Sequence, residues 1–245
     1  MTPMLVIAKR EFRSYFDSPL AYVVICLSYL ALGVFFFAIG GRFWQVDKAS
    51  LQGLFEYAPI GLSLLVVPVV TMRLLAEEKR SGTLEMLITL PVRDHQVILG
   101  KFFGAWGLVL ILIASTALYP IMMFWQPWNL GVLDSGPVLA GYLGLILYSA
   151  AAVSIGLLIS ALTDSQVIAF FITWALLVLL SFMGFANNIV GPGMARNVIA
   201  FVGFDARLTP FARGQIVTRD IVYFISITIA CLMAAFRALE RRKWA

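Results

Sequence analysis

Long apolar segments alternate with short charged segments along almost the whole chain. A helix of about 20 apolar residues crosses the ~30 Å hydrocarbon core of a bilayer. The pattern therefore predicts an all-α integral membrane protein that forms one transmembrane domain over residues 1–245. The six predicted spans are at about 20–39, 57–75, 101–124, 138–162, 166–186 and 221–236.

The uncharged part of the second span is short for a helix that crosses the bilayer. Only 16 residues separate Glu56 from Arg73, which is about 24 Å of helix. Pro59 and Pro68 lie inside it, where neighbouring helices can satisfy the carbonyls that a proline leaves unbonded. We therefore expect this helix to continue past the membrane into the charged segment that follows.

The first 17 residues predict an amphipathic helix over about 4–17 that lies in the headgroup layer, with its cations toward anionic lipid. Ser18-Pro19 then turns the chain into the first span. The apolar side of the helix is formed by Leu5, Ala8, Phe12, Tyr15 and Phe16. The polar side is formed by Lys9, Arg10, Arg13 and Asp17.

The segment from Met72 to Lys101 is the only long charged stretch between two spans. Ser81-Gly82 can end a helix, because glycine adopts the left-handed conformation without steric cost. Thr83 can cap a new short helix that Pro91 ends, with Glu85 in its first turn and an apolar face. Asp94 can cap the next span. The apolar face of the short helix consists of Leu84, Leu87 and Ile88.

Such a helix is suited to press on a partner outside the membrane. The plainer interpretation of the segment is a solvated loop.

Residues 187–219 form the second unusual stretch, since they are too polar for a span. Two apolar pieces, 194–204 and 208–217, are separated by Asp205-Ala206-Arg207. We expect two short helices at the outer face of the membrane, and the alternative is a plain external loop.

Composition agrees with the membrane class, since 61% of the residues are hydrophobic and 13% are charged. The net charge of +5 arises from basic residues that flank the spans, so we expect no nucleic-acid partner. Twelve Lys and Arg residues fall on the side of the two termini and of the 72–101 segment, and six fall on the other side. The positive-inside rule then predicts cytoplasmic termini.

The residues that several kinds of chemistry require are absent from the sequence. The sequence has no phosphate-cradling G-x-x-x-x-G-K-[ST] motif, no acidic residue in the middle of a span, and no Cys/His/Asp cluster for a metal or catalytic triad. His95 is the only histidine. Small residues in the third and fourth spans favour close packing and interhelical hydrogen bonds. They are Ser115, Thr116, Gly141, Gly144, Ser149, Ser154, Gly156 and Ser160.

The charged segment resembles the cytoplasmic coupling segment of the ABC type-2 permease family. Residues 9–24 also resemble the start of its gliding-motility-associated branch. The residues that match the family are Glu77, Glu78, Lys79, Arg80, Gly82, Thr83, Glu85, Leu87, Pro91, Gly100 and Lys101. Before the last span, Phe211, Arg213 and Gly214 match as well.

The resemblance implies a non-catalytic permease subunit of an ABC exporter in a bacterial-type inner membrane. ATP and Mg²⁺ would then be bound by separate ATPase subunits. The chain would pair with a second permease, and an accessory membrane or periplasmic subunit could join them. The coupling residues would be Glu77, Glu78, Arg80, Gly82, Thr83, Leu84, Glu85, Leu87, Ile88 and Pro91. The alternatives are a secondary transporter or channel that uses no ATP, a membrane-embedded enzyme, or a membrane scaffold.

Overall fold

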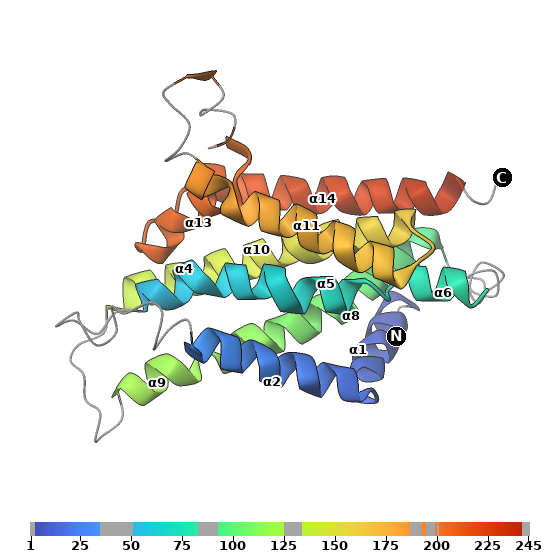
Figure 1. The fold of residues 1–245 in the computed structure, drawn as a ribbon, viewed down its shortest axis with the longest axis horizontal. Helices are drawn as coiled ribbons and strands as arrows, with labels where there is room; N and C mark the ends of the chain where they lie inside the picture. Colours follow the sequence, from blue (N-terminus) through green and yellow to red (C-terminus); the bar gives the residue numbers. More distant parts are fainter. Residues whose placement is uncertain are drawn as a thin grey trace.

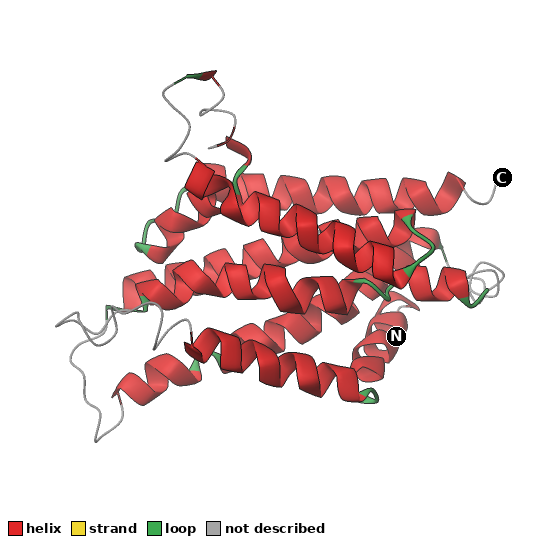
Figure 2. Cartoon of the chain, viewed as in Figure 1, coloured by secondary structure: helices red, strands yellow, loops and turns green. Residues whose placement is uncertain are grey.

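The computed structural model describes residues 3–34, 51–82, 93–124, 134–186, 193–194, 199 and 201–241. All regular elements within these ranges are helices (Figure 2). They are α1 (Pro3–Phe16), α2 (Pro19–Val34), α4 (Gln52–Gly61), the π-helix η2 (Leu62–Val66), α5 (Val67–Thr71), α6 (Ala76–Arg80), α8 (Asp94–Ser115), α9 (Leu118–Phe124), α10 (Ser135–Leu162), α11 (Gln166–Ala186), α13 (Phe204–Ala212) and α14 (Thr218–Arg241).

Five of the described helices are long and apolar enough to cross a membrane. They cover Gln52–Arg80, Asp94–Ile121, Ser135–Leu162, Gln166–Gly184 and Thr218–Glu240. The apolar part of α2 is shorter, Tyr22–Val34, so the sixth span stays a prediction. The long helices lie side by side, and α1 and the end of α14 are at the same end of the bundle as α6 (Figure 1). The prediction of an all-α integral membrane protein is confirmed.

Three helices extend beyond the predicted spans, because each helix continues past its apolar residues. The helix of the second span begins at Gln52, before Tyr57, and that of the last span runs over Thr218–Arg241, beyond 221–236. The third begins at Asp94, seven residues before Lys101, and its N-cap is Arg93 instead of Asp94. The backbone N–H of Arg93 donates to the side-chain oxygen of Gln96 at 3.3 Å. Polar residues continue a helix beyond the hydrocarbon layer, so hydropathy places a helix end too early.

Helix α10 is the centre of the bundle. Its most apolar 18-residue stretch is 72% buried, compared with 11% for the corresponding stretch of α14. Helix α14 therefore presents most of its apolar surface outward. The glycines of α10 allow neighbours to approach closely, as predicted: Gly141 faces Phe55 and Gly156 faces Thr71. A Cβ atom at Gly144 would lie 2.8 Å from the Cβ of Phe211. In a bilayer, where lipid competes for apolar surface, such close packing is a main source of helix association.

The helix of the second span changes its hydrogen-bond pattern between its two prolines. The π-helical turn Leu62–Val66 precedes Pro68, which has no N–H to donate. The Pro59 carbonyl accepts hydrogen bonds from the hydroxyls of Ser63 (2.8 Å) and Tyr148 (3.0 Å). Ser181 lies 2.9 Å from Ser63, so α4–η2, α10 and α11 meet in one buried hydroxyl cluster. One hydroxyl of the same span and one of a neighbouring helix thus bond to the backbone at the proline.

As expected, the second span continues into the charged segment, as far as Arg80, but a turn interrupts the helix. A turn over Met72–Leu75 separates α5 from α6. This turn is stabilised by Ser160 of α10, whose hydroxyl accepts hydrogen bonds from the backbone N–H groups of Leu75 and Ala76, both at 3.0 Å. It donates in turn to the Met72 carbonyl at 3.3 Å.

The expected division of residues 194–217 at Asp205-Ala206-Arg207 was also wrong. These three residues lie inside α13, which begins after the extended N-cap Gly203. Arg207 is buried because its guanidinium donates to the carboxylate of buried Asp220 at 2.8 Å. The same guanidinium stacks on the rings of Phe201 and Tyr223, 4.9 and 5.0 Å from their centroids. A charge that interrupts an apolar pattern in sequence is therefore neutralised inside the fold.

Candidate functional site

The candidate site is the end of the bundle where α6 leads into the predicted coupling segment. Helix α6 ends at Arg80, and the N–H groups of Ser81 and Gly82 return to the carbonyls of Glu77 (3.0 Å) and Lys79 (3.3 Å). Gly82 has φ +72°, so the left-handed glycine expected at this helix end is present. Arg80, Ser81 and Gly82 are exposed.

The rest of the predicted coupling segment lies outside the described residues. This holds for Thr83, Leu84, Glu85, Leu87, Ile88 and Pro91. Their role therefore stays a prediction.

Lys101 connects three helices at the site. Its side chain is 3% exposed, and its ammonium lies 2.7 Å from the Glu78 carboxylate of α6 and 3.3 Å from the Glu11 carboxylate of α1. One buried cation on α8 therefore joins two other helices. Two carboxylates around one ammonium supply the acceptors that a buried Lys needs.

Lys79 ties α6 to the opposite side of the bundle. Its ammonium donates to the Ala161 carbonyl and, at 3.3 Å, to the Thr163 carbonyl, and it lies 3.6 Å from Asp164. These residues form the end of α10 and the turn that leads into α11. Basic groups are favoured near the unpaired carbonyls at a helix C-terminus. Together with Ser160, Lys79 fixes α6 on the α10–α11 hairpin.

The outer surface of α6 carries the remaining predicted coupling residues. Glu77 pairs with Arg73 at 3.1 Å within the same segment, whereas Arg80 is exposed. The guanidinium of Arg73 also lies 6.0 Å from the ring centroid of Tyr15, whose hydroxyl donates to the Val70 carbonyl at 2.9 Å. Burial raises the pKa of the Tyr15 phenol well above its usual value. Thus α6 and the end of the second span are bonded to α1 as well.

Helix α1 rests on two glycines of α8 spaced four residues apart. A Cβ atom at Gly100 would lie 2.8 Å from the Cβ of Ile7, and one at Gly104 would lie 2.7 Å from the Cβ of Glu11. The inward face of α1 therefore includes Ile7 and Glu11, while Leu5, which belongs to the predicted apolar side, is 53% exposed. Of the predicted interfacial residues, Phe12 and Phe16 pack at the core, and Lys9, Arg10 and Arg13 are exposed.

Glu11 is a site residue that the sequence analysis missed. It follows Ile7 by four residues and precedes Tyr15 by four, so it belongs to the buried stripe of α1. A carboxylate within such a stripe requires a buried partner. Lys101 is the corresponding charged residue on the other helix, since it lies seven residues after the start of α8.

At the opposite end, the predicted residues of the 187–219 stretch have separate environments. Phe211 is buried against Gly144, Arg213 is exposed, and Gly214 has φ +82° beside Pro137. The position of Phe211 serves helix packing and that of Gly214 ends a helix. Neither position indicates a ligand site.

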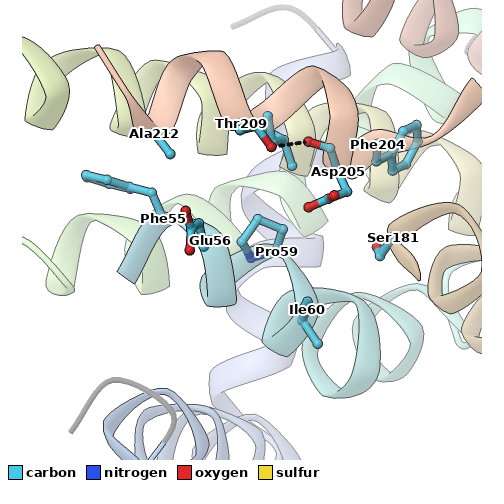
Figure 3. A pocket seen from close by; sticks show the side chains of 10 residues that line it. Phe55, Glu56, Pro59, Ile60, Ser181, Phe204, Asp205, Thr209 and Ala212 are labelled. Atoms are coloured by element: carbon cyan, nitrogen blue, oxygen red, sulfur yellow. Dashed lines mark hydrogen bonds between the residues drawn. The ribbon is translucent and has the colours of Figure 1, made fainter. Parts of the chain in front are cut away.

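A small pocket opens at this end between α4, α11 and α13 (Figure 3), with an empty volume of about 330 Å³ that includes space open to solvent. The carboxylates of Glu56 and Asp205 line it, and the Thr209 hydroxyl donates to the Asp205 carbonyl at 2.9 Å. Burial raises the pKa of Asp205, and the charge of Glu56 raises it further. The pocket is connected to the hydroxyl cluster through Ser181.

Known proteins that are similar to this chain are transporter proteins. The family described as "ABC-2 family transporter protein" matches residues 45–236, which is most of the chain. Over 109 residues the chain is 29% identical to the "Probable multidrug ABC transporter permease YbhR" of Escherichia coli (strain K12). The same figures hold for the protein of that name from Escherichia coli O157:H7. The aligned part covers 44% of this chain and 28% of the relative.

The gliding-motility branch stays a prediction. The match over residues 45–236 includes the charged segment, four of the five long apolar helices and most of the fifth. The chain therefore belongs to the ABC-2 transporter family.

Proposed function

We propose that this chain is the membrane-spanning permease subunit of an ATP-driven ABC exporter. A separate ATPase subunit would bind ATP and Mg²⁺ and press on residues 83–91. The observation that carries the proposal is the attachment of α6. Through Lys101 and Lys79, this short helix is bonded to α1, α8 and the α10–α11 hairpin, so a displacement of residues 83–91 would move all of them.

The assembly follows from the same reasoning. Two permease chains, identical or similar, would enclose the path, with one ATPase beneath each and both termini in the cytoplasm of a bacterial-type cell. Helices α11 and α14 supply large exposed apolar surfaces for lipid or for the second permease. The name of the relative, a probable multidrug permease, supports transport of small drug molecules.

We expect Leu87→Asp to weaken binding of the ATPase. Burial of a leucine side chain contributes roughly 1.5–3 kcal/mol, so the complex should dissociate about 10- to 150-fold more readily. The measurement is co-purification of the two subunits together with substrate-stimulated ATP hydrolysis. Thr89→Asp is the control, since helical spacing places it on another face than Leu84, Leu87 and Ile88. Normal binding and coupling of Leu87→Asp would mean that the segment is a solvated loop that does not hold the ATPase.

The orientation has its own test. With Cys26 and Cys231 replaced, a single cysteine at Ser81 should react with a membrane-impermeant thiol reagent only after the cells are opened, because twelve basic residues mark that side as cytoplasmic. A cysteine at Asn197 should react in intact cells. The reverse pattern of labelling would overturn the orientation.

A further inference from the structure

The outward face of α1 carries three cations in a row. Lys9, Arg10 and Arg13 are all exposed, while the opposite face of α1 is fixed on α8. They line a groove together with Val6, Ser14 and Asp17. Among the residues that the structure describes, none of these three cations forms a salt bridge, and Asp17 is the only carboxylate in the groove.

The surroundings of the groove are those of a membrane boundary. Leu5 and Val6, at the start of α1, are 53% and 52% exposed. Helix α2, an apolar helix, starts at Pro19, and its Tyr22 and Val23 are exposed as well. A surface that combines exposed cations with exposed aliphatic side chains matches a phosphate that is attached to acyl chains.

We propose that the groove of α1 binds the headgroup of an anionic phospholipid. Arg10 and Arg13 bond the lipid phosphate, Lys9 adds a third positive charge, and the acyl chains lie along Leu5, Val6 and the start of α2. Arginine suits this role because its planar guanidinium donates two parallel hydrogen bonds to a phosphate. The site takes its ligand from the leaflet on the α6 side, and it is independent of the ATPase.

The rigid attachment of α1 favours a defined site over diffuse attraction. A free amphipathic helix would adjust its depth and rotation to any charged surface. Here the close contacts at Gly100 and Gly104 fix the position of α1 on α8. The Lys101 ammonium also lies 3.3 Å from the Glu11 carboxylate, on the buried side of α1. The three cations therefore keep one orientation, and such preorganisation favours a single bound lipid.

The test is a lipid titration of the purified full-length chain in a neutral detergent. Dioleoyl phosphatidylglycerol and dioleoyl phosphatidylcholine are compared at low ionic strength, with binding followed by native mass spectrometry. We expect wild-type protein to prefer phosphatidylglycerol. In Arg10→Gln/Arg13→Gln the affinity for it should fall roughly 20-fold, since each cation near an anionic headgroup contributes about fivefold.

The matched control is Arg219→Gln/Arg237→Gln, which removes two exposed charges elsewhere and should keep the preference. Thermal unfolding of both variants checks that they are folded. Equal affinity of wild type and Arg10→Gln/Arg13→Gln for phosphatidylglycerol would overturn the proposal. So would displacement of the lipid by 10 mM inorganic phosphate, which would indicate a site for free phosphate. A variant that binds lipid normally but loses the ATPase would show that the groove is a protein-docking surface instead.

Discussion

Lys101→Met is expected to loosen α1 and α6 from α8 and to uncouple ATP hydrolysis from transport. The substitution leaves the carboxylates of Glu11 and Glu78 facing each other without their cation. Removal of one partner of a buried ion pair destabilises a protein by about 3–5 kcal/mol. We expect the lower part of that range, because the two glutamate side chains are 18% and 21% exposed. The measurement is chemical unfolding of the purified chain, followed by substrate-stimulated ATP hydrolysis of the complex.

A second variant separates stability from coupling. Lys101→Met/Glu11→Gln/Glu78→Gln removes all three charges, and replacement of a whole buried ion network is often neutral for stability. If the ion pairs transmit movement, this variant regains stability while its ATP hydrolysis stays independent of substrate. Recovery of both properties would assign Lys101 a purely structural role. Arg237→Gln, which breaks an exposed ion pair, is the control and should change stability by less than about 0.5 kcal/mol.

Gly104→Leu is expected to displace α1 from its seat. The Cβ atom alone would lie 2.7 Å from the Cβ of Glu11 and 3.0 Å from the backbone oxygen of Ala8, and a backbone atom cannot move aside by rotating. Overpacking of this kind costs about 1–3 kcal/mol. It should also lengthen the contact between Glu11 and Lys101, so the effect on coupling should resemble that of Lys101→Met.

The displacement can be measured as a spin-label distance between an exposed position of α1 and one of α11. Gly53→Ala is the matched control, because nothing lies within 4 Å of its added methyl group. If the spin-label distance and the unfolding midpoint of Gly104→Leu both equal those of the wild type, the described contact between α1 and α8 is contradicted.

The five long apolar helices were predictable from the sequence because apolar length is a strong physical constraint in a bilayer. The left-handed Gly82 and the close packing at Gly141, Gly144 and Gly156 were predictable for a similar reason, since only glycine fits there. Helix ends were less predictable, because polar residues extend a helix beyond the hydrocarbon layer. This explains the early start of α8 at Asp94.

The connections between distant elements could not be read from local patterns. The turn over Met72–Leu75 depends on a hydroxyl of Ser160, which is more than 80 residues away in the chain. Asp205 and Arg207 looked like a break between helices because their neighbours in space, Glu56 and Asp220, are not neighbours in sequence. Of the candidate site, the sequence identified Glu78 and Lys101 separately, as family matches, whereas their pairing with Glu11 required the fold.

The pair between Glu11 and Lys101 also sets an order of events during synthesis. The two residues are 90 positions apart, so α1 leaves the ribosome well before its cation does. Until α8 has entered the membrane, the carboxylate in the buried stripe of α1 has no Lys101, and the helix has neither Gly100 nor Gly104 to rest on. Docking of α1 must therefore wait until α8 has been made and inserted. A nascent chain arrested before α8 should keep α1 accessible to protease, and the same helix should become protected once α8 has been inserted.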